Sequence, residues 1–367
     1  MSRKYLNIHK YDVRHLFGID FFKFDLMKYL LNINLFDVVS HKIESYKPDV
    51  VVLHNFDNLW SSIILKAIKR YKKANSKVKV LMTLHDYHII SVTTSFTYYE
   101  GDKLNYFDKV TSFFELLKKR IDRRGRIYGY ARMLQYYLYY SLLNLRSIID
   151  TFIFTSEFIM NKCVQRRKEG NVKVIYSPTK FVNSYKVKKV GRSLKILFSG
   201  RVSKEKGVFE FLNLVIASSV EMKRKIHFDI IGEGDLLDEL KGLTEGSHSI
   251  IYIHGRKSHD FLESKLITFN FVLLPSTVFE NAPLSLVERT FKGCNIITMN
   301  YGDMKEIGKQ LTSSILSDEL TQPSVDNMLK VLDGFEDSSE YKKQRVLLAG
   351  NYGVEEYIRL IKNELNE

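Results

Sequence analysis

Two glutamates, Glu280 and Glu288, stand eight positions apart, directly after the apolar run 271–275. Pro283 lies between them, and proline is favoured at the first position of a helix. Asn281 is a good N-cap residue, so we expect it to cap a helix that Pro283 opens. The backbone N–H groups at such a helix end bind anions. The segment therefore fits a phosphorylated, hydroxyl-rich ligand, although two unpartnered surface carboxylates would explain it equally well.

A second loop carries two cations. It reads Gly-Arg-Val-Ser-Lys-Glu-Lys-Gly over 200–207 and follows an apolar run that predicts a strand. Gly200 lets the backbone turn sharply as it leaves the strand. Arg201 and Lys206 then flank a loop that leads into a predicted helix, an arrangement that suits a diphosphate. Taken alone, solvated loop cations are the commoner explanation of this pattern.

Two histidines end the predicted strands of the first half. His85 lies at the carboxyl end of the predicted strand 78–82, where a side chain is well placed to contact substrate, although a lone histidine there is more often structural. His54, after the preceding strand, is a weaker candidate. The spacing of His85 and His88 is compatible with a metal, but no matching ligand set occurs elsewhere, so the sequence predicts no metal site.

The segment Gly232-Glu233-Gly234 begins like a dinucleotide-binding fingerprint. Leu237 occupies the place of the third glycine, and the segment lies in the middle of the chain. It is therefore a poor signal for NAD.

Alternating strands and helices must position these residues. Such alternation predicts parallel, doubly wound sheets, which bind ligands at the carboxyl ends of their strands. In the second half we expect strands at 195–199, 226–231, 249–253, 270–274 and 295–299, and helices at 207–223, 235–241, 259–267, 283–292 and 303–309. In the first half we expect strands at 50–53, 78–82, 151–154 and 172–175, helices at 23–46 and 59–74, and an aromatic-rich helix over about 107–147, with a linker at 177–193.

Length and composition favour a two-domain protein with a full core. The chain has 367 residues, of which 45% are hydrophobic. Two cysteines, Cys163 and Cys294, are too few for a disulfide framework and indicate a reducing compartment. The sequence has no 18-residue apolar run and no apolar signal core at its start, so we expect a cytoplasmic protein.

The positive charge is confined to the first half. The net charge is +14; residues 1–180 carry 31 Lys+Arg against 16 Asp+Glu, and residues 181–367 carry 25 against 26. This asymmetry indicates an anionic partner for the first half: a lipid surface, a phosphorylated acceptor or nucleic acid. A basic run at 118–132 followed by tyrosines at 136–140 suits anionic headgroups, and a solvated face with a buried aromatic side fits equally well. No nucleic-acid recognition motif accompanies it, so we expect no nucleic acid partner.

Taken in order, the motifs of the second half resemble one family. They read Phe-Ser-Gly-Arg-x4-Lys-Gly from residue 198, Ile-Ile-Gly-x-Gly from 230, Ile-His-Gly from 253 and Leu-Pro-Ser-x3-Glu-x2-Pro-x4-Glu from 274. The chain resembles the retaining GT-B glycosyltransferases of the glycosyltransferase group 1 family, of the surface-polysaccharide type. The resemblance is specific over about 193–310. It is looser over 48–180, where it rests on Thr-Leu-His-Asp-Tyr from residue 83 and similar short segments.

The resemblance implies an α/β GT-B fold, with two Rossmann-like doubly wound domains facing each other across a cleft. Residues 1–180 would form the acceptor-binding domain and residues 193–345 the nucleotide-sugar-binding domain. A C-terminal helix within 346–367 would pack back onto the first domain.

The resemblance also implies roles for single residues. Arg201 and Lys206 would neutralise the donor diphosphate and the leaving nucleoside diphosphate. Glu288 would accept hydrogen bonds from the ribose, and Glu280 would face the transferred sugar. His85, from the first domain, would contact that sugar near the reacting carbon. The backbone near Gly255 would line the base pocket, and the segment Asn281, Ala282, Pro283, Leu284 would touch sugar or phosphate.

The implied reaction moves a hexose from a UDP-sugar or GDP-sugar to a saccharide acceptor with retention of configuration. Family members usually need neither a cofactor nor a metal. The acceptor would be a glycan or a polyprenyl-diphosphate-linked saccharide, in lipopolysaccharide or capsule synthesis. The basic first half then indicates a peripheral protein at the inner face of the plasma membrane.

The chain departs from the family at its start. Family members open with a strand and a Gly-Gly loop, whereas Met1 to Phe24 shows no such pattern and Gly18 stands alone. We therefore expect an abbreviated first domain that lacks one or two strands. This departure leaves a non-catalytic or truncated GT-B scaffold as the alternative, with a GT-B phosphorylase or epimerase as a weaker one.

Overall fold

In a computed structural model, the chain forms two compact units, Met1–Ile175 with Leu365–Glu367, and Tyr176–Glu364. The structure describes residues 5–8, 33–54, 63–87, 91–93, 96–101, 103–106, 113–122, 124–164, 171–179, 193–244, 251–311, 314–336 and 341–366. His88 and most of the predicted linker lie outside these residues, as do Gly18 and the first part of the helix predicted at 23–46.

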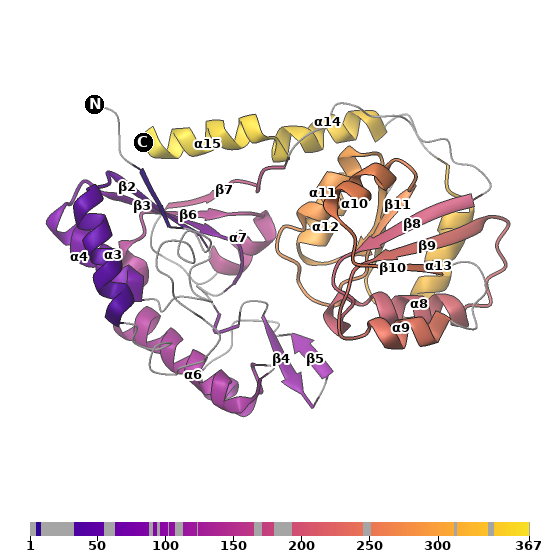
Figure 1. The fold of residues 1–367 in the computed structure, drawn as a ribbon, viewed down its shortest axis with the longest axis horizontal. Coiled ribbons are helices and arrows are strands. Elements are labelled where there is room, and N and C mark those ends of the chain that lie inside the picture. Colours follow the sequence, from indigo (N-terminus) through magenta and orange to yellow (C-terminus); the bar gives the residue numbers. More distant parts are fainter. Residues whose placement is uncertain are drawn as a thin grey trace. The chain divides into compact units, whose positions relative to one another are not determined.

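The first unit is built on a parallel sheet of five strands in the order β1-β2-β3-β6-β7 (Figure 1). Val, Leu, Ile and Phe side chains fill its central strands and are buried there, which is typical of a sheet covered on both faces. The strands are β1 (Tyr5–Ile8), β2 (Val50–His54), β3 (Lys79–Leu84), β6 (Thr151–Phe154) and β7 (Asn171–Val174).

The start of the chain corrects the expectation of a shortened sheet. Residues Tyr5–Ile8 form β1, which pairs in parallel with β2 from Tyr5 opposite Val50 to Ile8 opposite Leu53. The run is only four residues long, so its apolar pattern is a weak sequence signal. The prediction that Met1 to Phe24 contains no opening strand was therefore wrong.

The aromatic-rich span also differs from the single long helix that we predicted. Its described residues form several short helices, with Gly125, at φ 126°, before α6, and an antiparallel hairpin precedes the span at 97–106. The elements are β4 (Thr97–Glu100), β5 (Lys103–Tyr106), α5 (Phe113–Lys118), α6 (Arg126–Tyr136), a π-helical extension (Tyr137–Leu142) and a 3-10 turn (Leu145–Ile148). The other helices of this unit are α3 (Ile33–Tyr46), α4 (Ile63–Ala74) and α7 (Glu157–Val164).

The second unit has a six-stranded parallel sheet in the order β10-β9-β8-β11-β12-β13. This is the doubly wound order 3-2-1-4-5-6, in which the chain reverses direction across the sheet between its first and fourth strands. The strands are β8 (Ser193–Ser199), β9 (Lys225–Ile231), β10 (Ile251–Gly255), β11 (Phe271–Leu274), β12 (Asn295–Met299) and β13 (Ile315–Ser317). The point of reversal lies between β8 and β11, where ligands bind in such sheets.

Helices cover both faces of this sheet, and each face has its own apolar core (Figure 1). Leu194, Ile196 and Phe198 of β8 face α8, α9 and α13, whereas Leu197 faces α10, α11 and α12. The helices are α8 (Val208–Ala217), α9 (Leu237–Thr244), α10 (His259–Leu266), α11 (Leu284–Phe291), α12 (Gly302–Gly308), α13 (Gln322–Asp333), α14 (Tyr341–Tyr352) and α15 (Val354–Asn366). The predicted α/β class with two Rossmann-like domains is confirmed.

None of the described helices is both long enough and apolar enough to cross a bilayer. The two cysteines, Cys163 and Cys294, are both buried and neither forms a disulfide. The packing of the last helix onto the first domain stays a prediction.

Candidate functional site

The loops that follow β8 and β11 are joined backbone to backbone at the point of reversal. Thr277 donates its N–H to the carbonyl of Glu205 at 2.9 Å, and the Ser276 hydroxyl donates to the same carbonyl at 2.9 Å. Gly207 has φ 65°, and a Cβ on it would lie 2.1 Å from the carbonyl oxygen of Pro275. Only glycine fits there, so the close approach of the two loops depends on Gly207.

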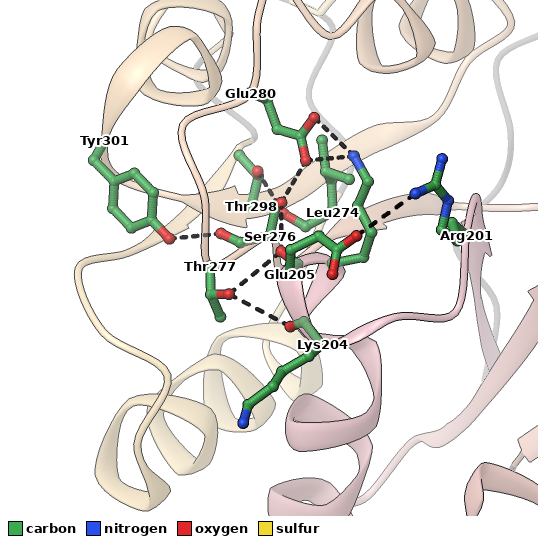
Figure 2. A network of polar contacts seen from close by, with 10 residues as sticks. Arg201, Lys204, Glu205, Leu274, Ser276, Thr277, Glu280, Thr298 and Tyr301 are labelled. Atoms are coloured by element: carbon green, nitrogen blue, oxygen red, sulfur yellow. Dashed lines mark hydrogen bonds and ion pairs between the residues drawn. The ribbon is translucent and has the colours of Figure 1, made fainter. Parts of the chain in front are cut away.

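This junction brings Lys206 and Glu280 together from 74 residues apart. Lys206 Nζ lies 2.6 Å from Glu280 Oε1 and 2.8 Å from Oε2. The Ser276 hydroxyl oxygen is also within short hydrogen-bond distance of Oε1 of the same carboxylate (Figure 2), so its single proton is shared between Oε1 and the Glu205 carbonyl. Both charged side chains are largely shielded, with 27% of Lys206 and 14% of Glu280 exposed. Two residues that the sequence assigned to neighbouring parts of one ligand therefore form a direct ion pair.

Arg201 is the freer of the two predicted cations. Its guanidinium lies 3.8 Å from Glu205, and 67% of its side chain is exposed. Figure 2 shows Arg201 on the side of the loop nearer Glu280, whereas Lys204 points away from Glu280. The structure thus places Arg201, Lys206 and Glu280 on one pair of loops.

Two residues at the start of α12 hold the loop after β11. Asp303 is 1% exposed, and its Oδ2 accepts the N–H of Ala282 at 2.5 Å. The Tyr301 hydroxyl donates to the carbonyl of Ser276 at 2.5 Å (Figure 2). Ala282 has φ 39°, a left-handed conformation that costs a non-glycine residue about 1–3 kcal/mol, so the contact with Asp303 stabilises a strained loop.

This geometry corrects two expectations for the segment 281–284. Asn281 does not cap the helix, because α11 begins at Leu284 after Pro283 and has no side-chain cap. The N–H of Ala282 is bonded to Asp303, and Pro283 has no N–H. Leu284 is the first residue of α11, and the first backbone N–H groups of a helix have no acceptor within the helix. The N–H of Leu284 is therefore the donor of this segment that suits a sugar or phosphate oxygen.

Glu288 lies on the second turn of α11. Its Oε1 accepts a hydrogen bond from the Thr179 hydroxyl at 3.1 Å. The next residue, Arg289, is buried; its Nη1 donates to the carbonyl of Ser285 at 2.8 Å, and its Nη2 donates to the hydroxyl of Ser199 at 2.5 Å. Burial lowers the pKa of the Arg289 guanidinium. Arg289 therefore fixes α11 to the end of β8.

Gly255 lies at the carboxyl end of the edge strand β10, with φ 66°. Its carbonyl accepts the N–H of Gly232, and Gly200 donates its own N–H to Ile231; both contacts measure 3.0 Å. A Cβ on Gly232 would lie 1.8 Å from the carbonyl oxygen of Gly200. The glycines that began like a dinucleotide fingerprint thus allow the ends of β8, β9 and β10 to pack closely.

His85, in the first unit, pairs with His54, the residue that sequence reasoning ranked lower. His54 Nδ1 lies 3.1 Å from His85 Nε2, and both rings are half-buried. Their strands are in register, with His54 opposite Thr83, so the two rings emerge side by side at the carboxyl ends of β2 and β3. One ring must donate and the other accept, which restricts the tautomer of His85.

Among the described residues, no group of three His, Cys, Asp or Glu side chains is arranged to hold a metal ion. Sequence reasoning also missed Thr179, Ser276, Tyr301 and Asp303. Of these four residues, only Ser276 could have been found from the sequence, because it belongs to the Leu-Pro-Ser motif that begins at residue 274.

Comparison with known proteins gives a family-model match within the second unit and a fold for the whole chain. Residues 181–345 match the family described as "Glycosyl transferases group 1". No curated protein matches the chain significantly.

Many solved structures share the fold. Anabaena Alr3699/HepE in complex with UDP superposes with a TM-score of 0.63 at 12% identity, covering 91% of this chain and 82% of its own. The lipopolysaccharide outer core galactosyltransferase WaaB gives 0.59 at 16% identity, covering 93% and 79%. Sucrose-phosphate synthase from Thermosynechococcus elongatus gives 0.62 at 13%, covering 92% and 78%. The chain therefore has the GT-B fold, and its residues 181–345 match the model of the group 1 glycosyl transferases.

Proposed function

We propose that the chain transfers a hexose from a nucleoside diphosphate sugar to a saccharide acceptor with retention of configuration. The observation that carries this proposal is the convergence of Arg201, Lys206 and Glu280 at the point where the sheet of the second unit reverses, with Glu288 on the helix that follows. A site with two cations and two carboxylates suits a ligand that combines a diphosphate with hydroxyl groups. The group 1 match and the UDP-bound neighbours support the same ligand class.

Arg201 and Lys206 act on the diphosphate. Cleavage of the glycosyl–phosphate bond leaves negative charge on the departing phosphate, and fixed cations beside it lower the barrier. Lys206 is paired with Glu280 in the unliganded protein, so on donor binding it turns from the carboxylate toward the phosphate and gives up part of this pair. The N–H of Leu284 adds a donor at the start of α11.

Glu288 binds the ribose and Glu280 faces the sugar. A carboxylate has about four acceptor positions, so Glu288 keeps capacity for two ribose hydroxyls beside its bond from Thr179. Glu280 is held by Lys206 and Ser276, which fix its direction. The backbone at Gly255 lines the base, and His85, oriented by His54, contacts the sugar from the first domain. The resemblance implies that no metal ion is required.

A polyprenyl-diphosphate-linked saccharide at the inner face of the plasma membrane is the proposed acceptor. The first half carries all the excess positive charge, and the helices α5 and α6 expose large apolar side chains beside cations. Phe114 is 75% exposed, Ile127 77% and Leu134 56%, and Tyr130 of α6 lies within 3.5 Å of the Leu117 carbonyl of α5. Apolar side chains flanked by Lys and Arg suit an anionic lipid surface.

The opening strand β1 removes the main reason for the scaffold alternative, which was the lack of that strand.

The proposed transfer is tested by incubating the protein with UDP-sugars and GDP-sugars together with membrane extract. We expect transfer to a lipid-extractable product, with the anomeric configuration of the donor retained. The proposal would be overturned if none of these sugars were transferred and none were hydrolysed.

A further inference from the structure

The segment 176–179 leads from the first unit into the second and contacts the site that we propose for the donor. It begins the second unit directly after Ile175. Thr179 is 7% exposed, and its hydroxyl donates to Glu288 Oε1 at 3.1 Å. Thr179 stands 109 residues before Glu288, so only the fold brings the two together.

The position of Thr179 is fixed by other contacts. Its N–H donates to the carbonyl of Tyr352 at 2.9 Å. The hydroxyl of Tyr176 donates to Glu306 Oε1 at 2.8 Å, and the rings of Tyr176 and Tyr352 lie 4.8 Å apart. The segment is therefore attached to α12 through Glu306 and to the end of α14 through Tyr352, so the Thr179 hydroxyl is presented to Glu288 from a rigid support.

A carboxylate on a helix surface rotates freely unless something holds it. One donor on Oε1 fixes the plane of the Glu288 carboxylate and leaves its remaining lone pairs for a ligand. Two adjacent ribose hydroxyls need both oxygens in a fixed plane, because each hydrogen bond requires good alignment. Orientation before binding saves the entropy of ordering the side chain when the ligand arrives.

We propose that Thr179 is a positioning residue for Glu288, and that the connecting segment 176–179 is thereby part of the nucleotide site. The inference rests on the proposed function, since it takes Glu288 as the group that binds the ribose. Thr179 itself does not touch the nucleotide; it acts through the carboxylate.

The test compares Thr179→Val, which removes the hydroxyl at nearly constant shape, with Thr179→Ser, which keeps it. Thr268→Val is the matched control, because the hydroxyl of Thr268 is exposed and bonds only its own turn, at the carbonyl of Lys265. Calorimetry measures the affinity of the full-length proteins for UDP and for 2′,3′-dideoxy-UDP, with GDP and its dideoxy form in parallel. Thermal unfolding without ligand reports any structural effect.

We expect Thr179→Val to weaken UDP binding roughly tenfold, the size of one hydrogen bond to a charged group, and Thr179→Ser and Thr268→Val to change it less than about twofold. The loss should vanish with the dideoxy nucleotide, which has no ribose hydroxyls for Glu288. An equal loss with both nucleotides, unchanged binding or tighter binding in Thr179→Val would overturn the inference. Failure of the proposed function gives another result, since the unsubstituted protein would then bind neither UDP nor GDP.

Discussion

The ion pair between Lys206 and Glu280 predicts that a conservative change will separate nucleotide binding from sugar transfer. In Glu280→Gln the side chain keeps its size and still accepts from Ser276, but it no longer competes with a phosphate for the Lys206 charge. UDP lacks the sugar that Glu280 is proposed to face. The variant should therefore bind UDP more tightly than the unsubstituted protein and transfer sugar much more slowly.

The exposure of the pair sets the size of the effect. Exposed ion pairs are worth about 0–1 kcal/mol, and breaking a buried one costs about 3–5 kcal/mol. Lys206 and Glu280, 27% and 14% exposed, lie between these limits. If about 1 kcal/mol of the pair is given up when Lys206 turns toward phosphate, its removal tightens UDP binding by roughly fivefold. Loss of an oriented group at the reacting sugar lowers kcat by roughly 10²–10³.

The assay is calorimetry with UDP, followed by transfer kinetics with the active donor. Glu263→Gln is the matched control, because Glu263 of α10 forms a comparable half-buried pair at 2.8 Å with Lys292, the residue that follows α11. The control should leave UDP affinity unchanged. Weaker UDP binding in Glu280→Gln, or unaltered transfer, would refute the assignment of Lys206 to the diphosphate and Glu280 to the sugar.

Three further predictions follow from single contacts. Gly207→Ala should destabilise the protein by several kcal/mol and abolish UDP binding, because the new Cβ meets the Pro275 backbone. The control Gly242→Ala, in open space on α9, should instead stabilise the protein by about 0.5–1 kcal/mol. Urea unfolding measures both changes. Burial raises the pKa of Asp122, but hydrogen bonds from Arg124 and the charge of Arg132 outweigh it and lower that pKa to about 2. Asp122→Asn should therefore cost about 2 kcal/mol of unfolding free energy at pH 7, and this penalty should fall below half only under about pH 3. A penalty independent of pH would contradict this. Ile127→Ser should reduce binding to phosphatidylglycerol vesicles roughly tenfold, and Leu347→Ser, equally exposed in the second unit, should not; equal losses would exclude a specific membrane face.

The strands that the sequence predicted well are those marked by a compact run of apolar residues. The strand β12 has the predicted bounds, and β8 and β9 agree to within two residues, because each is a compact apolar run. The motifs around Lys206 and Glu280 indicated a shared site because both follow strands of one sheet. Their direct ion pair was not predictable, since it depends on how closely Gly207 lets the two loops approach.

The remaining differences have tertiary causes. Asn281 has the intrinsic preference of a helix cap, but Asp303 binds the next residue and draws the loop into a left-handed turn, so the helix starts later. The contacts of Glu288 with Thr179 and of His54 with His85 join residues 109 and 31 positions apart. No local pattern encodes such pairs; they follow from the order of the strands.

The central claim is that the second unit binds a nucleoside diphosphate through Arg201, Lys206 and Glu288. Calorimetric titration of the unsubstituted protein with UDP and GDP tests it most directly, with Arg201→Ala beside it. We predict that one of the two nucleotides binds with a one-to-one stoichiometry, that binding weakens as salt is raised, and that Arg201→Ala abolishes it. Binding of neither nucleotide, or equal binding by Arg201→Ala, would contradict the account.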